Sequence, residues 1–231
     1  MDRYQYAARP MTVSNESAND ILWATYRWMS IGLALTGLVA WLVSRSPAAL
    51  ELLVQNRLVF YGLMIAQLGL VVGFSAAAAR VSTATAAAMF FVYAALTGLT
   101  FSVLFLIYTS SSIASTFFIT SGTFAGLSVF GAVTKRDLST VGRFAMFALI
   151  GLIIASIVNI FVASSALMWL TTVGGVLIFA ALTAYDTQAL KEMYAMHGGA
   201  GNLALRGALK LYLDFINMFI FLLQLTGRRR D

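Results

Sequence analysis

Long hydrophobic runs alternate with short polar breaks along the chain. Residues 81–134 contain no Asp, Glu, Lys or Arg, and residues 144–185 contain none either. A helix needs about 20 apolar residues to cross the hydrocarbon core of a bilayer, so each run is long enough for two crossings. The whole pattern predicts seven transmembrane helices, near residues 22–44, 58–79, 84–108, 112–134, 141–163, 166–191 and 203–225.

The polar breaks between these helices are only a few residues long. Short connections force consecutive helices to run antiparallel, and they leave no room for a water-soluble domain. The expected fold is therefore an all-α integral membrane protein. We divide it into an N-terminal cytoplasmic tail over residues 1–21, a seven-helix membrane domain over residues 22–226 and a basic C-terminal tail over residues 227–231.

Basic residues are unequally distributed between the two ends of the predicted helices. If the N-terminus is cytoplasmic, ten Lys and Arg residues lie on or near the inner side, whereas Arg45, Arg57 and Arg228–Arg230 lie outside. Cytoplasmic loops of membrane proteins carry the excess of Lys and Arg. The pattern predicts a cytoplasmic N-terminus, and the arginine tail is the one feature that opposes it.

Composition narrows the chemistry further. The chain is 60% hydrophobic and 10% charged, whereas soluble domains carry about 25% charged residues. Because the chain has no cysteine, disulfides, iron–sulfur clusters and thiol nucleophiles are excluded. The net charge of +6 reflects membrane topology rather than nucleic-acid binding, since no soluble domain presents a basic face. We expect no cofactor, and the lipid bilayer is the evident partner.

Two aspartates lie in the apolar sequence of the last two predicted helices. Since an α-helix rises ~1.5 Å per residue, Asp186 and Asp214 lie roughly 10 and 16 Å from the loop that joins these helices. Antiparallel neighbours therefore bring both acids to a similar depth. If the two side chains face each other, they form a pair of carboxylates.

The last helix also carries a polar stripe. Lys210, Asp214, Asn217 and Gln224 recur at spacings that place them on one helical face. A polar face within a membrane points at protein or water rather than at lipid. The stripe predicts that the last helix is central in the bundle, with Asn217, Lys210 and Gln224 as pore-lining or supporting residues. The alternative is that Asp214 is a structural carboxylate held by Lys210 one turn away.

The acid pair has a predictable chemistry. Two carboxylates a few ångström apart in a low-dielectric site cannot both ionise cheaply, so they tend to share a proton. Asp186 and Asp214 are therefore predicted to sense protons and to gate a path, with no catalytic role. They are also the candidate ligands of a weak, transient Ca²⁺ site, with further oxygens available from Asn217, Thr187 and Gln188.

Arg80 is the third candidate gating residue. It ends the second predicted helix and reaches the same side of the membrane as the two acids. A guanidinium can pair with a carboxylate through two hydrogen bonds. The alternative is that Arg80 is an ordinary anchor that extends to the lipid headgroups.

Three stretches resemble the signatures of the transmembrane Bax inhibitor motif family: GLTFS at 98–102, AYDTQ at 184–188 and LYLDFINMFI at 211–220. The likeness extends from GLALTG at 32–37 to the end of the last helix. It implies a bacterial inner-membrane protein of seven helices that acts as a pH-sensitive calcium leak channel. Ca²⁺ would then be the permeant ion rather than a cofactor, and protons would be the regulating ligand.

The resemblance also assigns roles to residues. The family's paired aspartates match Asp186 and Asp214 of this chain. The family's arginine at the end of the second helix, which pairs with the first aspartate in the closed form, matches Arg80. One departure is that Gln67 lies where some members carry a glutamate.

Two other function classes remain open. A non-transporting interaction protein that regulates stress responses or membrane proteolysis would bind its membrane-protein partners within the bilayer. Presenilin-type intramembrane aspartyl proteases also carry a Tyr-Asp pair on one helix, as in Tyr185-Asp186, and an Asp on the next. The glycines that precede the second aspartate of those proteases are absent before Asp214, so we do not expect an enzyme.

Overall fold

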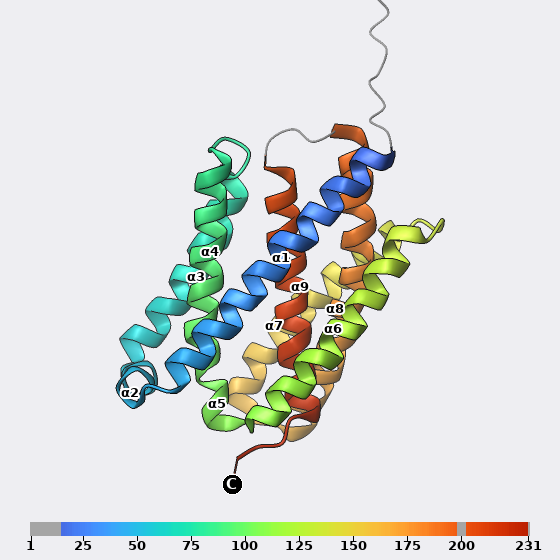
Figure 1. Cartoon of the computed structure of the whole chain (residues 1–231). Coiled ribbons are helices and arrows are strands. Elements are labelled where there is room, and N and C mark those ends of the chain that lie inside the picture. Colours follow the sequence, from blue (N-terminus) through green and yellow to red (C-terminus); the bar gives the residue numbers. More distant parts are fainter. Residues whose placement is uncertain (1–14, 198–201, 231) are drawn as a thin grey trace, which may run out of the picture.

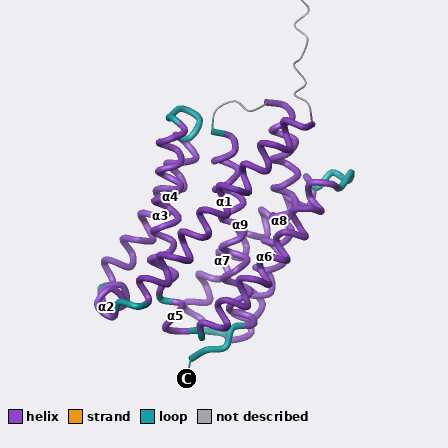
Figure 2. The backbone as a smooth tube through the Cα atoms, in the orientation of Figure 1, coloured by secondary structure: helices purple, strands orange, loops and turns teal. Residues whose placement is uncertain are grey.

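The computed structural model describes residues 15–197 and 202–230 of the chain. These residues form an antiparallel bundle of helices, drawn in Figure 1. In chain order the helices are α1 (Asn15–Ser44), α2 (Pro47–Gln55), α3 (Arg57–Ala77), α4 (Thr83–Ser102), α5 (Leu104–Ile107), α6 (Ser110–Val133), α7 (Ser139–Val162), α8 (Ser165–His197) and α9 (Leu203–Thr226). The all-α prediction is confirmed, and the tube view in Figure 2 shows helices joined by short loops throughout the described chain.

Seven of these segments are long and apolar enough to cross a membrane: α1, α3, α4 with α5, α6, α7, α8 and α9. The predicted number of spans is therefore confirmed, and most ends agree within about three residues, as expected for helix ends. The first helix differs, because it begins at Asn15 rather than near residue 22. Its candidate membrane span begins at Ala18, four residues before the predicted start. Residues 1–14 of the predicted N-terminal tail lie outside the described part.

The polar breaks end one helix and start the next. Ser46 accepts a hydrogen bond from the backbone N–H of Ala49 at the start of α2, where Pro47 occupies the first turn. Asn56 accepts hydrogen bonds from the backbone N–H groups of Leu58 and Val59, at 3.1 and 3.3 Å, at the start of α3. Side-chain oxygens at this position satisfy N–H groups that have no partner within the helix.

Helix α9 lies at the centre of the bundle. In its most hydrophobic 18-residue stretch, 61% of the residues are buried, whereas the corresponding share in the other six spans is at most 33%. It packs against α1, α4, α6 and α8, and Figures 1 and 2 show it enclosed by these helices. The predicted central position of the last helix is confirmed, and the two acids lie on α9 and on its antiparallel neighbour α8.

Close contacts at glycine fix the helices that surround α8. Gly131 of α6 lies directly against the backbone of Ala184, and Gly142 of α7 lies directly against the ring of Tyr185. A β-carbon at either position would overlap with α8. The segment AYDTQ at 184–188 is therefore packed tightly between α6 and α7, which holds Asp186 in place.

The start of α1 and the end of α9 lie at opposite ends of the bundle (Figure 1). After α9 the tail is bound to the connection between α5 and α6. The backbone carbonyl of Arg228 accepts a hydrogen bond from the N–H of Thr109 at 3.1 Å, and the N–H of Arg230 donates to the carbonyl of Ile107 at 2.9 Å. The last helix therefore runs the full length of the bundle. The arginines of the tail lie at the end opposite to the start of α1.

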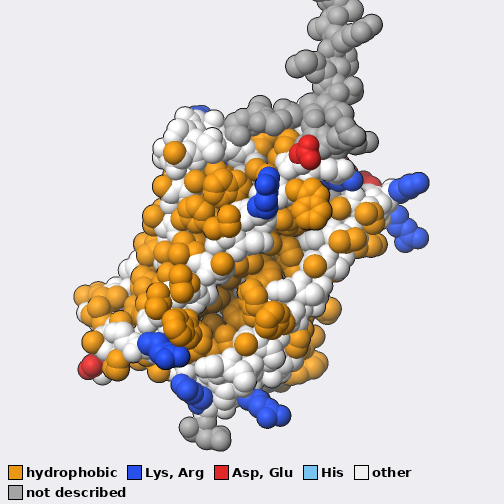
Figure 3. All heavy atoms as spheres, viewed as in Figure 1, with side chains coloured by type: hydrophobic (Ala, Val, Ile, Leu, Met, Phe, Trp, Pro, Cys, Tyr) orange, Lys and Arg blue, Asp and Glu red, His pale blue; other side chains and the backbone are white. Residues whose placement is uncertain are grey.

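The surface fits a membrane. Figure 3 shows hydrophobic side chains across the middle of one face, with Lys and Arg side chains mainly toward its two ends. Large apolar side chains are exposed on most of the seven spans, among them Trp23, Leu58, Phe144 and Phe161. Such a continuous apolar belt is typical of a surface that faces lipid.

Candidate functional site

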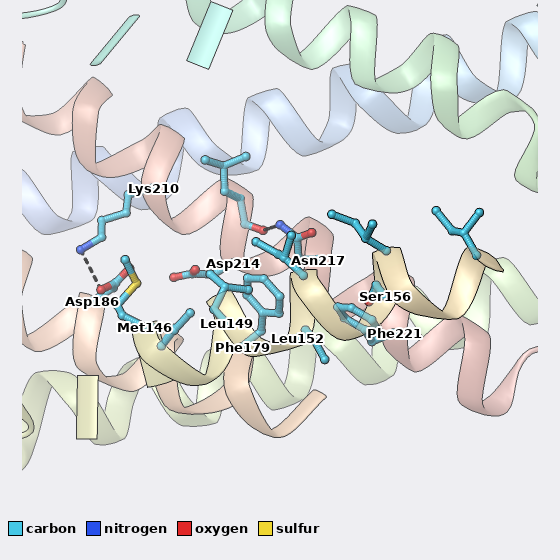
Figure 4. A pocket seen from close by; sticks show the side chains of 15 residues that line it. Met146, Leu149, Leu152, Ser156, Phe179, Asp186, Lys210, Asp214, Asn217 and Phe221 are labelled. Atoms are coloured by element: carbon cyan, nitrogen blue, oxygen red, sulfur yellow. Dashed lines mark hydrogen bonds and ion pairs between the residues drawn. The ribbon is translucent and has the colours of Figure 1, made fainter. Parts of the chain in front are cut away.

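Asp186 of α8 and Asp214 of α9 form a buried pair. Their exposed fractions are 3% and 5%, and both side chains line the same hollow of the bundle. Figure 4 shows the carboxylate of Asp214 pointing toward Asp186. The matching depth expected from their distances to the shared loop is thus accompanied by side chains that face each other.

Lys210 is the cation at this pair. Its Nζ lies 2.7 Å from Oδ1 of Asp186, marked by the dashed line in Figure 4. The same Nζ lies 5.5 Å from the ring centre of Tyr185, within the range of a cation–π contact. The Lys210 side chain is 47% exposed while that of Asp186 is almost fully buried. The lysine therefore balances the charge of Asp186 from the neighbouring helix, and Oδ2 of Asp214 has no hydrogen-bond partner among the described residues.

Arg80 lies away from the acids in this structure. It is exposed in the turn between α3 and α4, and the ion-pair partner of Asp186 within the described chain is Lys210. The predicted contact between Arg80 and Asp186 is therefore not formed in this arrangement. The physical reason is that Arg80 follows the last turn of α3, a helix that packs on α4 rather than on α8.

The turn that carries Arg80 is itself bound to the start of α9. The side-chain amide of Asn202 donates to the carbonyls of Ala78 and Val81, at 2.7 and 2.9 Å. Gln67 of α3 donates to the hydroxyl of Thr100 at 2.6 Å, which links α3 to α4. A shift of the α3–α4 turn would require the Asn202 contacts to break.

A cavity of about 510 Å³ lies between α7, α8 and α9, and both acids line it. It is open to the outer surface of the bundle along α7, where Met146, Ile153 and Ile160 are more than half exposed. We call it the acid cavity. Lys210 and Asn217 also line it, and Figure 4 shows these polar groups gathered toward one end of its length. Along α7 the lining runs from Met146 to Ile160, a rise of about 21 Å. The acid cavity thus follows a large part of the ~30 Å thickness of a hydrocarbon core.

The predicted polar stripe of the last helix divides in two. Lys210, Asp214 and Asn217 line the acid cavity, and the Asn217 amide donates to the backbone carbonyl of Leu213 at 2.8 Å. Gln224 lies further along α9 and accepts a hydrogen bond of 3.3 Å from Thr172 of α8. Gln224 therefore supports the contact between α8 and α9 and is not among the residues that line the cavity.

Two neighbours of Asp186 do not reach the acid pair. The Gln188 side chain accepts from the N–H of Leu138 at 2.8 Å and donates to the carbonyl of Arg136 at 2.9 Å, which anchors the loop between α6 and α7. The Thr187 hydroxyl lies 3.5 Å from that of Tyr26 on α1. Successive helical residues point about 100° apart, so residues next to Asp186 face other helices. The prediction that Thr187 and Gln188 supply oxygens to the acid pair is wrong for this arrangement.

Comparison with known proteins identifies the chain. Residues 18–231 match the model of the family described as "Inhibitor of apoptosis-promoting Bax1". The chain belongs to this Bax inhibitor family. The resemblance seen in the three sequence stretches is therefore confirmed over nearly the whole chain.

Several bacterial relatives share this similarity over most of their length. "Inner membrane protein YbhL" of Escherichia coli strain K12 is 49% identical over 210 residues, which cover 89% of this chain and 90% of the relative. A protein of Deinococcus radiodurans is 49% identical over 211 residues, with 90% and 89% coverage. A protein of Borreliella burgdorferi is 42% identical over 217 residues, with 92% and 94% coverage.

Sequence reasoning missed some parts of this Bax inhibitor family site. The contact of Lys210 with the ring of Tyr185 depends on how α8 and α9 are rotated, although Tyr185 stands directly before Asp186. A second cavity of about 420 Å³, between α3, α8 and α9, shares Lys210 and Leu213 with the acid cavity. These two side chains therefore separate two cavities, a feature that no spacing along one helix indicates.

The acid pair offers few ligands to a metal ion. Within the described part of the chain, no group of three or more His, Cys, Asp or Glu side chains is placed to hold one. The two carboxylates supply few of the six to eight oxygens that stable Ca²⁺ sites use.

Proposed function

We propose that this Bax inhibitor family member is a pH-responsive Ca²⁺ leak channel in which Asp186 and Asp214 sense protons. The observation that carries the proposal is a pair of facing, buried carboxylates at the polar end of a long cavity within a membrane bundle. Ionisable groups at membrane depth are costly and commonly mark ion or proton pathways. A merely structural pair would not require a cavity beside it.

The charge balance at the pair makes it sensitive to protons. Lys210 neutralises Asp186, whereas Asp214 has one buried oxygen without a hydrogen-bond partner in the described chain. A proton held between the two acids leaves the site neutral, and loss of that proton adds a negative charge. A cation is then the species that can restore the balance. Proton occupancy and cation occupancy are therefore expected to compete at Asp214.

The rest of the acid cavity supports a closed state. Beyond Asn217 its lining is apolar apart from Ser156, with Leu152, Ile157, Ile160, Phe179 and Phe221. An apolar lining excludes hydrated ions because water does not wet it stably. In the proposed mechanism, a change in the charge of the acid pair shifts α8 and α9 enough to hydrate this part. Leu213 and Lys210, which lie between the two cavities, move with α9.

The role of Arg80 is proposed separately. The family resemblance assigns Arg80 the closed-state ion pair with Asp186, whereas Lys210 occupies that place here. We propose that Lys210 holds the acid in the arrangement described, and that Arg80 acts only after the Asn202 contacts to the α3–α4 turn have changed. Mutations of Lys210 and of Arg80 should therefore have different effects.

The test is Ca²⁺ uptake into liposomes that contain the purified full-length protein and an internal Ca²⁺ dye, measured from pH 5 to pH 8. We expect uptake by the wild type to change with pH, and we expect Asp214→Asn and Asp186→Asn to remove that dependence because an amide does not titrate in this range. Asp137→Asn is the matched control, since Asp137 is an exposed acid in the loop between α6 and α7.

Two outcomes would overturn the proposal. An unchanged pH profile in both aspartate variants would exclude the pair as the sensor. Uptake no greater than that of empty liposomes at any pH would exclude a channel, and it would favour the interaction protein that binds partners within the bilayer.

The cellular location is proposed from two observations. The relative in Escherichia coli carries the name of an inner membrane protein, and the basic residues of this chain favour a cytoplasmic N-terminus. We propose the bacterial inner membrane, with the α8–α9 connection at the cytoplasmic face and the acid pair about midway along α9. In this orientation the protein would admit Ca²⁺ to the cytoplasm.

A further inference from the structure

A second hollow of the bundle lies far from the acid pair. It is a groove of about 420 Å³ between α1, α5, α6 and α9, toward the C-terminal end of the molecule. We call it the α1–α6 groove. Its lining is almost entirely apolar and includes Leu33 and Trp41 of α1, Phe105 of α5, Phe118 of α6 and Phe219 of α9. Figure 3 shows this face hollowed between α1 and α6.

The groove has the length and direction of a lipid chain. From Leu33 to Trp41 its wall follows α1 for about 12 Å, close to half of the ~30 Å hydrocarbon thickness. It runs along the helices, as the acyl chains of a bilayer do. Leu38 and Phe118 on its walls are 53% and 73% exposed, so the groove is open to the surrounding lipid.

Two arginine side chains contact residues that line the groove. Arg45 lies over the ring of Trp41, with its Cζ 4.7 Å from the ring centre. The side chain of Arg230 donates to the backbone carbonyl of Phe105 at 2.8 Å. A guanidinium has five N–H donors, so most donors of Arg230 remain for an anion.

Basic residues gather at this end of the bundle and would attract an anion. Arg45, Arg57 and Arg228–Arg230 lie here, and the acid at this end of the described chain is Glu51 of α2. Ser110, in the first turn of α6, also lines the groove. The N-terminus of a 24-residue helix adds a partial positive charge there.

We propose that the α1–α6 groove binds one anionic phospholipid, with an acyl chain between α1 and α6 and its phosphate between Arg45 and Arg230. The apolar walls account for the chain, and the two arginines at the rim account for the charged headgroup. Lipid binding does not depend on ion conduction, so its test is independent of the test of the proposed channel.

The C-terminal tail would order this site. The N–H of Arg228 donates to the hydroxyl of Ser112 at 2.9 Å, and Arg230 is bound through both its backbone and its side chain. These contacts hold the Arg230 guanidinium at the rim. Lipid binding would thus explain why three arginines lie at the end of the bundle where the positive-inside rule predicts few basic residues.

The experiment is native mass spectrometry of the purified full-length protein, titrated with phosphatidylglycerol or with phosphatidylcholine of the same acyl chains. We expect one phosphatidylglycerol to bind more tightly than phosphatidylcholine. We expect Arg45→Gln and Arg230→Gln each to weaken phosphatidylglycerol about fivefold, as for the loss of one basic contact near a membrane surface. Arg57→Gln is the control, because it removes a charge at the same end but outside the groove.

A second variant tests the groove itself. Gly37 lines the groove, and a β-carbon there would meet no atom within 4 Å. Gly37→Leu should therefore fold, fill the groove and abolish selective binding of the lipid. Gly62→Leu on α3 is its control, since Gly62 has equally open surroundings and lies outside the groove.

Each other outcome counts against the proposal. Equal retention of the two lipids by the wild type would exclude a headgroup site. An equal loss in Arg57→Gln would reduce the effect to overall charge, and full binding by Gly37→Leu would exclude the groove. A lipid-free dimer that Gly37→Leu dissociates would assign the groove to a second copy of the chain instead.

Discussion

At the scale of single residues, the site depends on three ionisable side chains that lie close together. Lys210 reaches Asp186 from the adjacent helix, and Asp214 lies beside both. A buried carboxylate without a counter-charge is far more costly than an exposed one. Lys210 therefore stabilises the buried carboxylate of Asp186, while its own side chain remains about half exposed.

Replacing Lys210 tests this charge balance. Lys210→Met removes the ammonium but keeps most of the chain volume, which leaves Asp186 buried without its ion pair. Breaking a buried pair commonly costs 3–5 kcal/mol, and we expect about 2 kcal/mol here because the lysine is half exposed. A lower thermal unfolding temperature in detergent would measure the loss.

Arg80→Gln is the matched variant for that measurement. Arg80 is exposed and makes no ion pair with Asp186 in this structure, so its unfolding temperature should stay within about 2 °C of the wild type. A larger loss in Arg80→Gln than in Lys210→Met would restore Arg80 as the cation that holds Asp186.

At the scale of helices, small residues decide where the backbones approach. Gly131 of α6 lies against the backbone of Ala184, so α6 presses on the segment that carries Asp186. The GxxxG pair of the same helix, Gly122 and Gly126, has no atom within 4 Å of either β-carbon position. Although such pairs are typical of close helix packing, this one makes no helix contact within the described chain.

Two substitutions in α6 separate these glycines. Gly131→Ala would force its β-carbon into the carbonyl of Ala184 and should cost about 1–3 kcal/mol, as overpacking does. Gly126→Ala should be neutral or stabilise by up to about 1 kcal/mol, because alanine favours the helix. Thermal unfolding of both variants in the same detergent checks the difference, and equal stability would contradict the contact at Gly131.

At the scale of the whole molecule, the bundle places its two polar regions at different depths. The acid pair lies about halfway along α9, roughly 16 Å from its start at Leu203, whereas Arg45 follows the end of α1 and the arginine tail follows the end of α9. The tail is held there by backbone hydrogen bonds to Thr109 and Ile107. The proposed proton sensor thus lies in the middle of the bundle, whereas the proposed lipid site lies toward one of its ends.

Cysteine labelling tests which leaflet is which. The chain has no native cysteine, so single substitutions report their own position. In intact cells, Gln55→Cys at the end of α2 should react with a membrane-impermeant maleimide, whereas Ser139→Cys at the start of α7 should react only after the cells are opened. The reverse pattern would place the N-terminus outside.

The sequence by itself determined the number of membrane-spanning helices, their antiparallel order and the central place of the last one. Hydrocarbon excludes charges, so the uncharged runs mark the spans, and the polar stripe of Lys210, Asp214 and Asn217 marks the face of α9 that meets protein or a cavity. The depth of Asp186 and Asp214 followed from the rise per residue.

Only the tertiary structure decided which neighbours these groups meet. Helical periodicity fixes the face on which a side chain lies, but the rotation and crossing of packed helices decide what that face touches. For this reason Lys210 rather than Arg80 pairs with Asp186, Gln188 turns to the α6–α7 loop, and Gln224 binds Thr172. The same packing brings Arg230 beside the groove that Arg45 borders, although the chain separates them by almost its full described length.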